Sequence, residues 1–464
     1  YSTYISHILE QSKMVRGIYD YPYTRQYENT WNYVYQFDQL FKWGLGPILG
    51  TICYLGFIYF IFYTYKYKSK LGFMILLWVI IYVIINGNFQ VKFMRYFLPV
   101  VPFLVLFGTV LLRDLNKKIL QFSKKYFYVR YLLLLLLLVP IIHFSISFIN
   151  GIYLTDHPAV LASKWLEENN SSKISIVQDH WEESIPNSSK INLVHERLEL
   201  YNMDSEDKFD KIFSNLSSAD YYVIFSNRLY GTIPRLKERY PASYLFYEKL
   251  FDGSLGFEIV NFQKQSMNWL SINYSENYFE RINIIKPEKI SNYEDKFLIN
   301  IDLGFSDESF SVYDHPNVII FKNNKNYTKE QLFDISTITN SNDNFQFNFF
   351  SEDYYKKYLK NNSIDEINIF KSQMYQDGNK DILKVISWIF IISLLGYLSV
   401  PIFYKLFINF PDFGFSFYKF FGILSFSYII WILTSYDFID FKLTDILFVL
   451  MIIFIISFFI FFTN

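Results

Sequence analysis

Four side chains close to apolar segments have the types and positions for chemistry at a membrane surface. Asp20 and Arg25 lie in the aromatic-rich stretch GIYDYPYTRQYENTWNYVYQFDQLFKWGLGP (17–47), and Lys92 and Arg95 lie in VKFMRYFLPVVPF (91–103). Arginine holds a phosphate through two parallel N–H bonds, and lysine adds a compact positive charge. Both stretches are expected outside the cytoplasm. Basic residues there run against the usual charge bias and so indicate a specific anionic partner, either a protein carboxylate or a lipid phosphate.

Simpler interpretations stay open for the same residues. Tyrosine and tryptophan before an apolar segment are typical of an interfacial helix or aromatic belt. Arg95 can equally extend to the interface from a helix end without binding anything.

Other polar groups are weaker candidates. His143 near the end of an apolar segment is either a proton carrier or, as we prefer, an interface residue. Asp179–His180 with Glu182 and Glu183, Ser226–Asn227–Arg228, and VYDHP (312–316) are each explained as well by a polar loop or turn. The sequence has no phosphate-binding glycine loop, HExxH or GxSxG motif, and its six histidines show no metal-ligand spacing, so it identifies no cofactor and leaves a divalent metal open.

The elements that must position these groups are seven apolar segments. A membrane helix needs about 20 mostly apolar residues to cross about 30 Å of hydrocarbon. The segments that meet or approach this length are 45–64, 71–87, 96–112, 131–149, 382–404, 415–434 and 444–462. They predict a multi-pass α-helical membrane protein, with Pro99 and Pro102 tolerated where neighbours satisfy the freed carbonyls.

Basic residues in the short loops predict the orientation. Lys66, Lys68 and Lys70 follow the first segment, and a Lys- and Arg-rich loop follows the third, so both loops are expected in the cytoplasm. Residues 1–43, the 88–95 loop and 150–380 are then outside, and the C-terminus is cytoplasmic. The expected location is the cytoplasmic membrane.

The expected divisions are an extracytoplasmic or interfacial segment (1–43), four membrane helices (44–150), a small α/β domain (151–265), a mixed, β-containing region (266–380) and three membrane helices (381–464). Strand and helix signals alternate between 158 and 262, which favours parallel pairing in an inserted extracytoplasmic α/β domain. The 309–322 stretch is expected to form two strands joined by a turn.

Composition excludes several classes. Of 464 residues, 52% are hydrophobic and 19% charged, which fits two materials, apolar helices and a polar domain. The net charge of -1 predicts no nucleic-acid partner, and the single cysteine, Cys53, excludes an intramolecular disulfide framework.

Several stretches together resemble the GT-C superfamily of membrane glycosyltransferases, in particular a bacterial branch with an extracytoplasmic domain. They are RYFLPVVPF (95–103), DYPYTRQ with WGLGPILG (20–26, 43–50), SNRLYGTIPRLKERYP with LFDGSLGFEIV (226–241, 250–260) and ESFSVYDHPNVIIF (308–321). The resemblance covers most of residues 15–325. It implies transfer of a sugar from a polyprenyl-phosphate carrier to an extracytoplasmic glycan, lipid or protein.

The resemblance also assigns roles. Arg95, then Arg25, with Lys92 in support, would stabilise the departing lipid phosphate, and Asp20 would orient Arg25 or contact the acceptor. The family keeps its catalytic carboxylate in a first outer loop that precedes more membrane helices than this chain has, so the chain is expected to be a fragment or an inactive paralogue, and no catalytic residue is assigned. The alternative function is a non-catalytic glycan-binding or assembly subunit in cell-surface polysaccharide biogenesis. A transporter is disfavoured because no ionisable relay or inverted repeat is evident.

Overall fold

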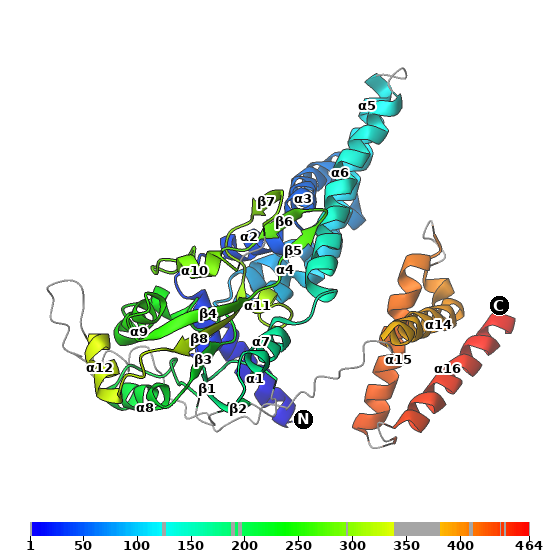
Figure 1. Cartoon of the computed structure of the whole chain (residues 1–464). Coiled ribbons are helices and arrows are strands. Elements are labelled where there is room, and N and C mark those ends of the chain that lie inside the picture. The colour runs from blue at the N-terminus through cyan, green and yellow to red at the C-terminus, as the bar shows by residue number, and fades with distance from the viewer. Residues whose placement is uncertain are drawn as a thin grey trace. The chain divides into compact units, whose positions relative to one another are not determined.

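The structure is a computed structural model that divides into two compact units, 1–362 and 363–464 (Figure 1). It describes residues 2–122, 127–186, 191–193, 197–293, 296–337, 381–407, 412–436, 438–439 and 442–463. The polar stretch 338–380, including most of the expected mixed region's second half, lies outside the described residues.

The long helices of the first unit match the first four apolar segments. They are α3 (Pro47–Tyr67), α4 (Lys70–Gly87), α5 (Val101–Phe122) and α6 (Phe127–Phe148). The two expected prolines fall where the 3₁₀ helix η3 (Met94–Val100) gives way to α5. Helices α3 and α5 cross at Gly56 and Gly108, where a Cβ on Gly56 would overlap the Gly108 backbone. Small residues of this kind let membrane helices approach closely.

The second unit contains α14 (Asp381–Phe407), α15 (Phe415–Ser435) and α16 (Leu443–Thr463). Among the described residues of both units, six helices are long and apolar enough to cross a membrane. The seventh expected segment coincides with α16, whose apolar stretch Ile446–Phe461 is shorter. A multi-pass helical membrane protein is therefore supported, and its sidedness stays a prediction.

Residues 2–44 fold into short helices that pack beside the 88–95 loop. They are α1 (Ser2–Val15), the 3₁₀ helix η1 (Pro22–Tyr27), α2 (Val34–Gln39) and the π-helical turn η2 (Leu40–Gly44). The Val15 carbonyl accepts hydrogen bonds from the amides of Gln90 and Val91 (2.9 and 3.2 Å). The N-terminal segment and this loop therefore lie at the same end of the membrane helices, as the loop charges predict.

The α/β domain is built on a five-stranded sheet in the order β2-β1-β3-β8-β4. The strands are β1 (Ile174–Gln178), β2 (Ile191–Leu193), β3 (Tyr221–Ile224), β4 (Phe257–Gln263) and β8 (Val318–Asn323). Strands β2, β1 and β3 are parallel, while β8 runs antiparallel to both β3 and β4. Because β8 belongs to this sheet, the sheet includes residues beyond the expected domain boundary at 265.

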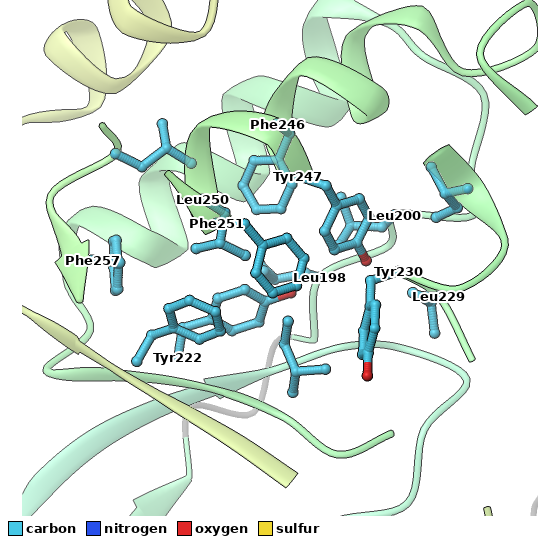
Figure 2. Packing of buried hydrophobic residues seen from close by; sticks show 14 of the residues in the cluster. Leu198, Leu200, Tyr222, Leu229, Tyr230, Phe246, Tyr247, Leu250, Phe251 and Phe257 are labelled. Atoms are coloured by element: carbon cyan, nitrogen blue, oxygen red, sulfur yellow. The ribbon is translucent and has the colours of Figure 1, made fainter. Parts of the chain in front are cut away.

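Both faces of the sheet are buried. Helices α8 (Glu206–Ser217), α9 (Pro241–Phe251) and α12 (Lys329–Thr337) contribute to the larger core on one face, and α7 (Pro158–Glu168) packs on the other. Figure 2 shows the larger core, where Tyr222 of β3 lies among aromatic side chains of α9. Residues at helical spacing in α8, from Phe209 to Leu216, are buried there, as the sequence pattern predicts.

A second, three-stranded sheet packs against α6. Its strands are β5 (Met267–Trp269), β6 (Ile272–Ser275) and β7 (Ile299–Asp302), in the order β5-β6-β7. Between β6 and β7 lies the short helix α10 (Glu288–Ser291), and β7 is followed by α11 (Glu308–Ser311). The expected pair of strands in 309–322 was thus half wrong, because the Asp307 carboxylate caps α11 by accepting from the Ser309 amide (2.9 Å).

Candidate functional site

Arg25 and Asp20 form an ion pair that joins the N-terminal segment to the α/β domain. Pro22 starts η1, and the turn brings the Arg25 Nε and Nη2 each to 3.0 Å from the two Asp20 carboxylate oxygens. The Arg25 Nη1 also donates to the Tyr201 carbonyl (2.8 Å) and to the Tyr240 hydroxyl. The pair expected from the sequence is therefore present, and its arginine is buried and directed at protein acceptors.

Further arginines of the domain contact the same segment. Arg239 forms ion pairs with Asp20 and with Glu28 (2.8 Å to the latter), and Arg235 donates to the Gln26 and Glu28 carbonyls (2.9 Å each). Burial acts to raise the pKa of Asp20, but Arg25 and Arg239 outweigh it and hold the pKa below its ordinary value. We call Asp20, Arg25, Glu28 and Arg239 the clasp.

A second polar cluster forms where β1 and β3 end. Both strands end at the same edge of the sheet, the usual place for ligands in parallel α/β folds. The Ser226 hydroxyl donates to Glu182 (2.6 Å), and the Arg228 Nε donates to Glu308 (2.6 Å). Gln26 of the N-terminal segment donates to the second Glu308 oxygen (2.9 Å). We call Gln26, Glu182, Ser226, Arg228 and Glu308 the strand-end network.

Burial shifts both carboxylates of this network toward the protonated form. It raises the pKa of Glu182 to about 7, against the opposing charge of Arg228 and the Ser226 hydrogen bond. It also raises the pKa of Glu308, opposed by Arg228 and, more weakly, by Arg95. Within the described residues, the Glu182 Oε2 atom is buried without a hydrogen-bond partner. A carboxyl with this pKa can exchange a proton near neutral pH, once a substrate or water reaches it.

Aromatic side chains lie between this network and the membrane end of the molecule. Trp181, directly before Glu182, has φ +68°, a conformation that a bulky residue rarely adopts and that often marks a functional site. Its main-chain carbonyl accepts from Arg228. The Tyr23 ring lies 6.2 Å from that of Trp181 and 6.5 Å from that of Phe93. Tyr23 therefore connects the strand-end network to the 88–95 loop.

Arg95 is the exposed cation at this position. Its guanidinium lies 4.0 Å from the centre of the Phe93 ring and 5.9 Å from that of Tyr96. Within the described parts of the chain it makes no hydrogen bond and no ion pair. A guanidinium over an aromatic face keeps its N–H groups available at the ring edge, where they can meet an anion.

Lys92 differs from Arg95 in being buried. Its ammonium donates to the Gln90 carbonyl (3.0 Å), and burial lowers its pKa to about 8. No carboxylate among the described residues forms an ion pair with it. The structure thus places Lys92 and Arg95 in one loop and Arg25 in the clasp. Tyr23 and Phe93 lie between Arg25 and Arg95.

The other polar candidates have structural partners. The two nitrogens of the His143 ring lie 3.1 Å from the Tyr274 hydroxyl and 3.0 Å from the Trp269 carbonyl. His315 of the 312–316 stretch lies 3.0 Å from the buried Glu276. Asp179 accepts from Tyr222 (2.6 Å), and burial raises its pKa well above the ordinary value.

Sequence reasoning did not identify Glu308, Gln26 or Arg239 as members of a site. Each lies inside a stretch that carries the resemblance, but its partner comes from a distant stretch. No group of three or more metal-binding side chains occurs in the ranges that the structure describes. The chain matches no protein-family model, no curated protein and no solved structure in the comparisons made. The family resemblance stays a prediction.

Proposed function

We propose that this protein binds a polyprenyl-phosphate-linked sugar at the membrane surface and takes part in transferring the sugar to an acceptor. Arg95 is the residue that contacts the carrier phosphate. The observation that supports this most directly is an exposed guanidinium at the start of an apolar helix, held over an aromatic ring and making no ion pair with a carboxylate in the described part of the chain.

The environment of Arg95 suits such a substrate. Tyr23, Trp181 and Tyr96 offer flat apolar faces. Aromatic surfaces beside a few oriented polar groups are typical of small-molecule sites. A fixed cation also stabilises the negative charge that develops on the phosphate when its bond to the sugar breaks. Glycosyl transfer from a lipid phosphate requires this stabilisation.

The clasp and the strand-end network have supporting roles in this proposal. Arg25 donates its hydrogen bonds to Asp20, Tyr201 and Tyr240. It therefore stabilises the protein around the site, and Arg95 is the arginine that binds the phosphate. Glu182 directly follows Trp181, and Glu308 accepts hydrogen bonds from Arg228 and Gln26. They lie at a strand edge where an acceptor can be bound.

The test is carrier binding by the full chain in nanodiscs. A polyprenyl monophosphate is the probe, and the same polyprenol without phosphate controls for the lipid tail. A charge-assisted hydrogen bond contributes about 1.5–3 kcal/mol, so Arg95→Ala is expected to weaken phosphate binding roughly 10- to 150-fold. Arg16→Ala, which removes an exposed arginine directly after α1, is the matched control and is expected to bind as the wild type does.

Equal affinity of Arg95→Ala and wild type for the phosphate would refute the assignment. Binding without any sugar transfer, measured with a radiolabelled carrier-linked sugar and a cell-envelope acceptor extract, would favour the non-catalytic subunit over the enzyme.

A further inference from the structure

The turn between β5 and β6 has an unusual composition for its conformation. Trp269 pairs with Ile272, so Leu270 and Ser271 form a two-residue loop, and both have positive φ (+49° and +60°). Turns with positive φ at both central residues strongly favour Asn-Gly and similar pairs. A leucine that is 70% exposed in such a turn is costly in water, because it adds backbone strain to exposed apolar surface.

The turn is fixed alongside α6. The Gln265 side chain donates to the Ile152 carbonyl (3.2 Å), the Asn150 side chain donates to the Asn268 carbonyl (2.9 Å), and the Trp269 carbonyl lies 3.0 Å from His143. The partners on the helical side move back from 152 to 150 to 143 as β5 advances. At 1.5 Å per residue, the nine residues from 152 to 143 correspond to roughly 13 Å, so the chain from Gln265 to Trp269 descends by about this much along the helix toward the middle of the membrane span.

The level that the turn reaches is the outer limit of the apolar helices. Phe144 follows His143, and its ring lies 2.9 Å from where a Cβ on Gly46 would be, so this level is also the start of α3 at Pro47. On α6 itself, Val139 and Ile142 are each 52% exposed at or just below this level, as expected of a lipid-facing surface. The turn thus continues an apolar surface that already belongs to a candidate membrane span.

The neighbouring edge strand adds to the same apolar end. Ile299 pairs with Ile272 beside the turn, and its amide donates to the Ser271 carbonyl (3.2 Å). Leu298 and Ile299 are 84% and 47% exposed, whereas the far end of β7 is the polar Asp302. Figure 1 shows β5 and β6 beside α6, on the side of the α/β domain that faces the long helices.

We propose that the β5–β6 turn and the start of β7 form a membrane-inserted edge, with Leu270 and Leu298 at the boundary between lipid head groups and acyl chains. Trp269 lies at the interface level that suits tryptophan. The edge anchors the small sheet to the bilayer, so the α/β domain is attached to the membrane at a point distinct from its helical connections. This inference depends on the membrane helices and is independent of the proposed glycosyl transfer.

Depth measurement with a fluorescent label tests the proposal. Cys53 is the only cysteine, and Cys53→Ala gives a background for single cysteines at Leu270 and Leu298. A third cysteine at the exposed Ser254, in the turn after α9, is the control. Each bimane-labelled full chain is placed in nanodiscs of ordinary or acyl-brominated phosphatidylcholine. Bromolipid is expected to quench the labels at 270 and 298 about twofold and to leave the label at 254 unchanged.

Aqueous iodide should quench the label at 254 and leave the labels at 270 and 298 largely unquenched. Quenching of all three labels by iodide, or quenching of the first two by neither agent, overturns the proposal, since the edge then faces water or another protein.

Leu270→Asn provides a test without any label. Asparagine suits positive φ, so a turn in water would be stabilised by the change, whereas a turn in lipid would be destabilised. The expected result is a lower thermal midpoint in nanodiscs, and a higher one refutes membrane insertion.

Discussion

Removal of the Arg25 side chain separates its two possible roles, as an internal link and as a phosphate ligand. Arg25→Ala deletes both hydrogen bonds to Asp20 and those to Tyr201 and Tyr240. Asp20 keeps one partner, Arg239, and its side chain is 20% exposed. The change therefore leaves a half-buried carboxylate with one ion-pair partner, while the Tyr201 carbonyl keeps its hydrogen bond from the Tyr240 hydroxyl (3.1 Å).

The magnitude follows from these contacts. Breaking a buried ion pair by removing one partner costs about 3–5 kcal/mol, and the retained Arg239 and partial solvent access place this case at about 3 kcal/mol. A cost of this size raises the opening constant of the attached segment roughly 150-fold. Asp20→Asn is expected to open the same segment, and the double variant little further, because both changes remove one shared interaction.

Hydrogen–deuterium exchange of the full chain measures this opening directly. Peptides covering 17–30 and 198–206 should exchange roughly 150-fold faster in Arg25→Ala, while peptides from α3 should be unchanged. Lys237→Ala, which removes an exposed cation near the clasp, is the control and should exchange as the wild type does. Wild-type exchange in Arg25→Ala, combined with loss of carrier-phosphate binding, would refute the structural role and make Arg25 the phosphate ligand.

Two further predictions concern buried groups. Because burial raises the pKa of Glu182 from 4.5 to about 7, its contribution to stability is full below pH 4.5 and is lost as the pH rises through 7. Glu182→Gln should remove about 2–3 kcal/mol of pH dependence, seen as a smaller fall in thermal midpoint between pH 5 and 8, and equal slopes would contradict the assignment. Gly56→Leu should force α3 away from Gly108 and lower the midpoint, unlike Leu55→Ala at an exposed position, and an unchanged midpoint would contradict the close crossing.

The membrane helices were predictable because a run of about 20 apolar residues has few alternatives to crossing a bilayer. Strands β1 and β3 were also predictable, since each is a short apolar run bounded by polar residues. The position of β8 between β3 and β4 was not, because a strand buried on both faces carries no signal for its neighbours. The helix α11 was missed because its cap, Asp307, also resembles a turn residue.

Most of the candidate site could not be predicted, for a different physical reason. The sequence shows which charged side chains need an ion-pair or hydrogen-bond partner if they are buried. It does not show where in the chain that partner lies. Arg25 meets the Tyr201 carbonyl 176 residues away, and Gln26 meets Glu308 282 residues away. Only the Asp20–Arg25 pair, five residues apart, was within reach of sequence reasoning.

The stretches that carry the family resemblance contribute several of their charged and polar groups to contacts with one another. Asp20 pairs with Arg239, Gln26 with Glu308, and Glu308 with Arg228. Such groups shape the walls of a site, so their substitution should reduce activity together with stability. Arg95 lies in the same set of stretches and lacks a hydrogen-bond or ion-pair partner among the described residues. Substitution of Arg95 should therefore reduce function without reducing stability. Measuring activity and thermal stability on the same variants distinguishes a residue that contacts the ligand from one that supports the structure of the site.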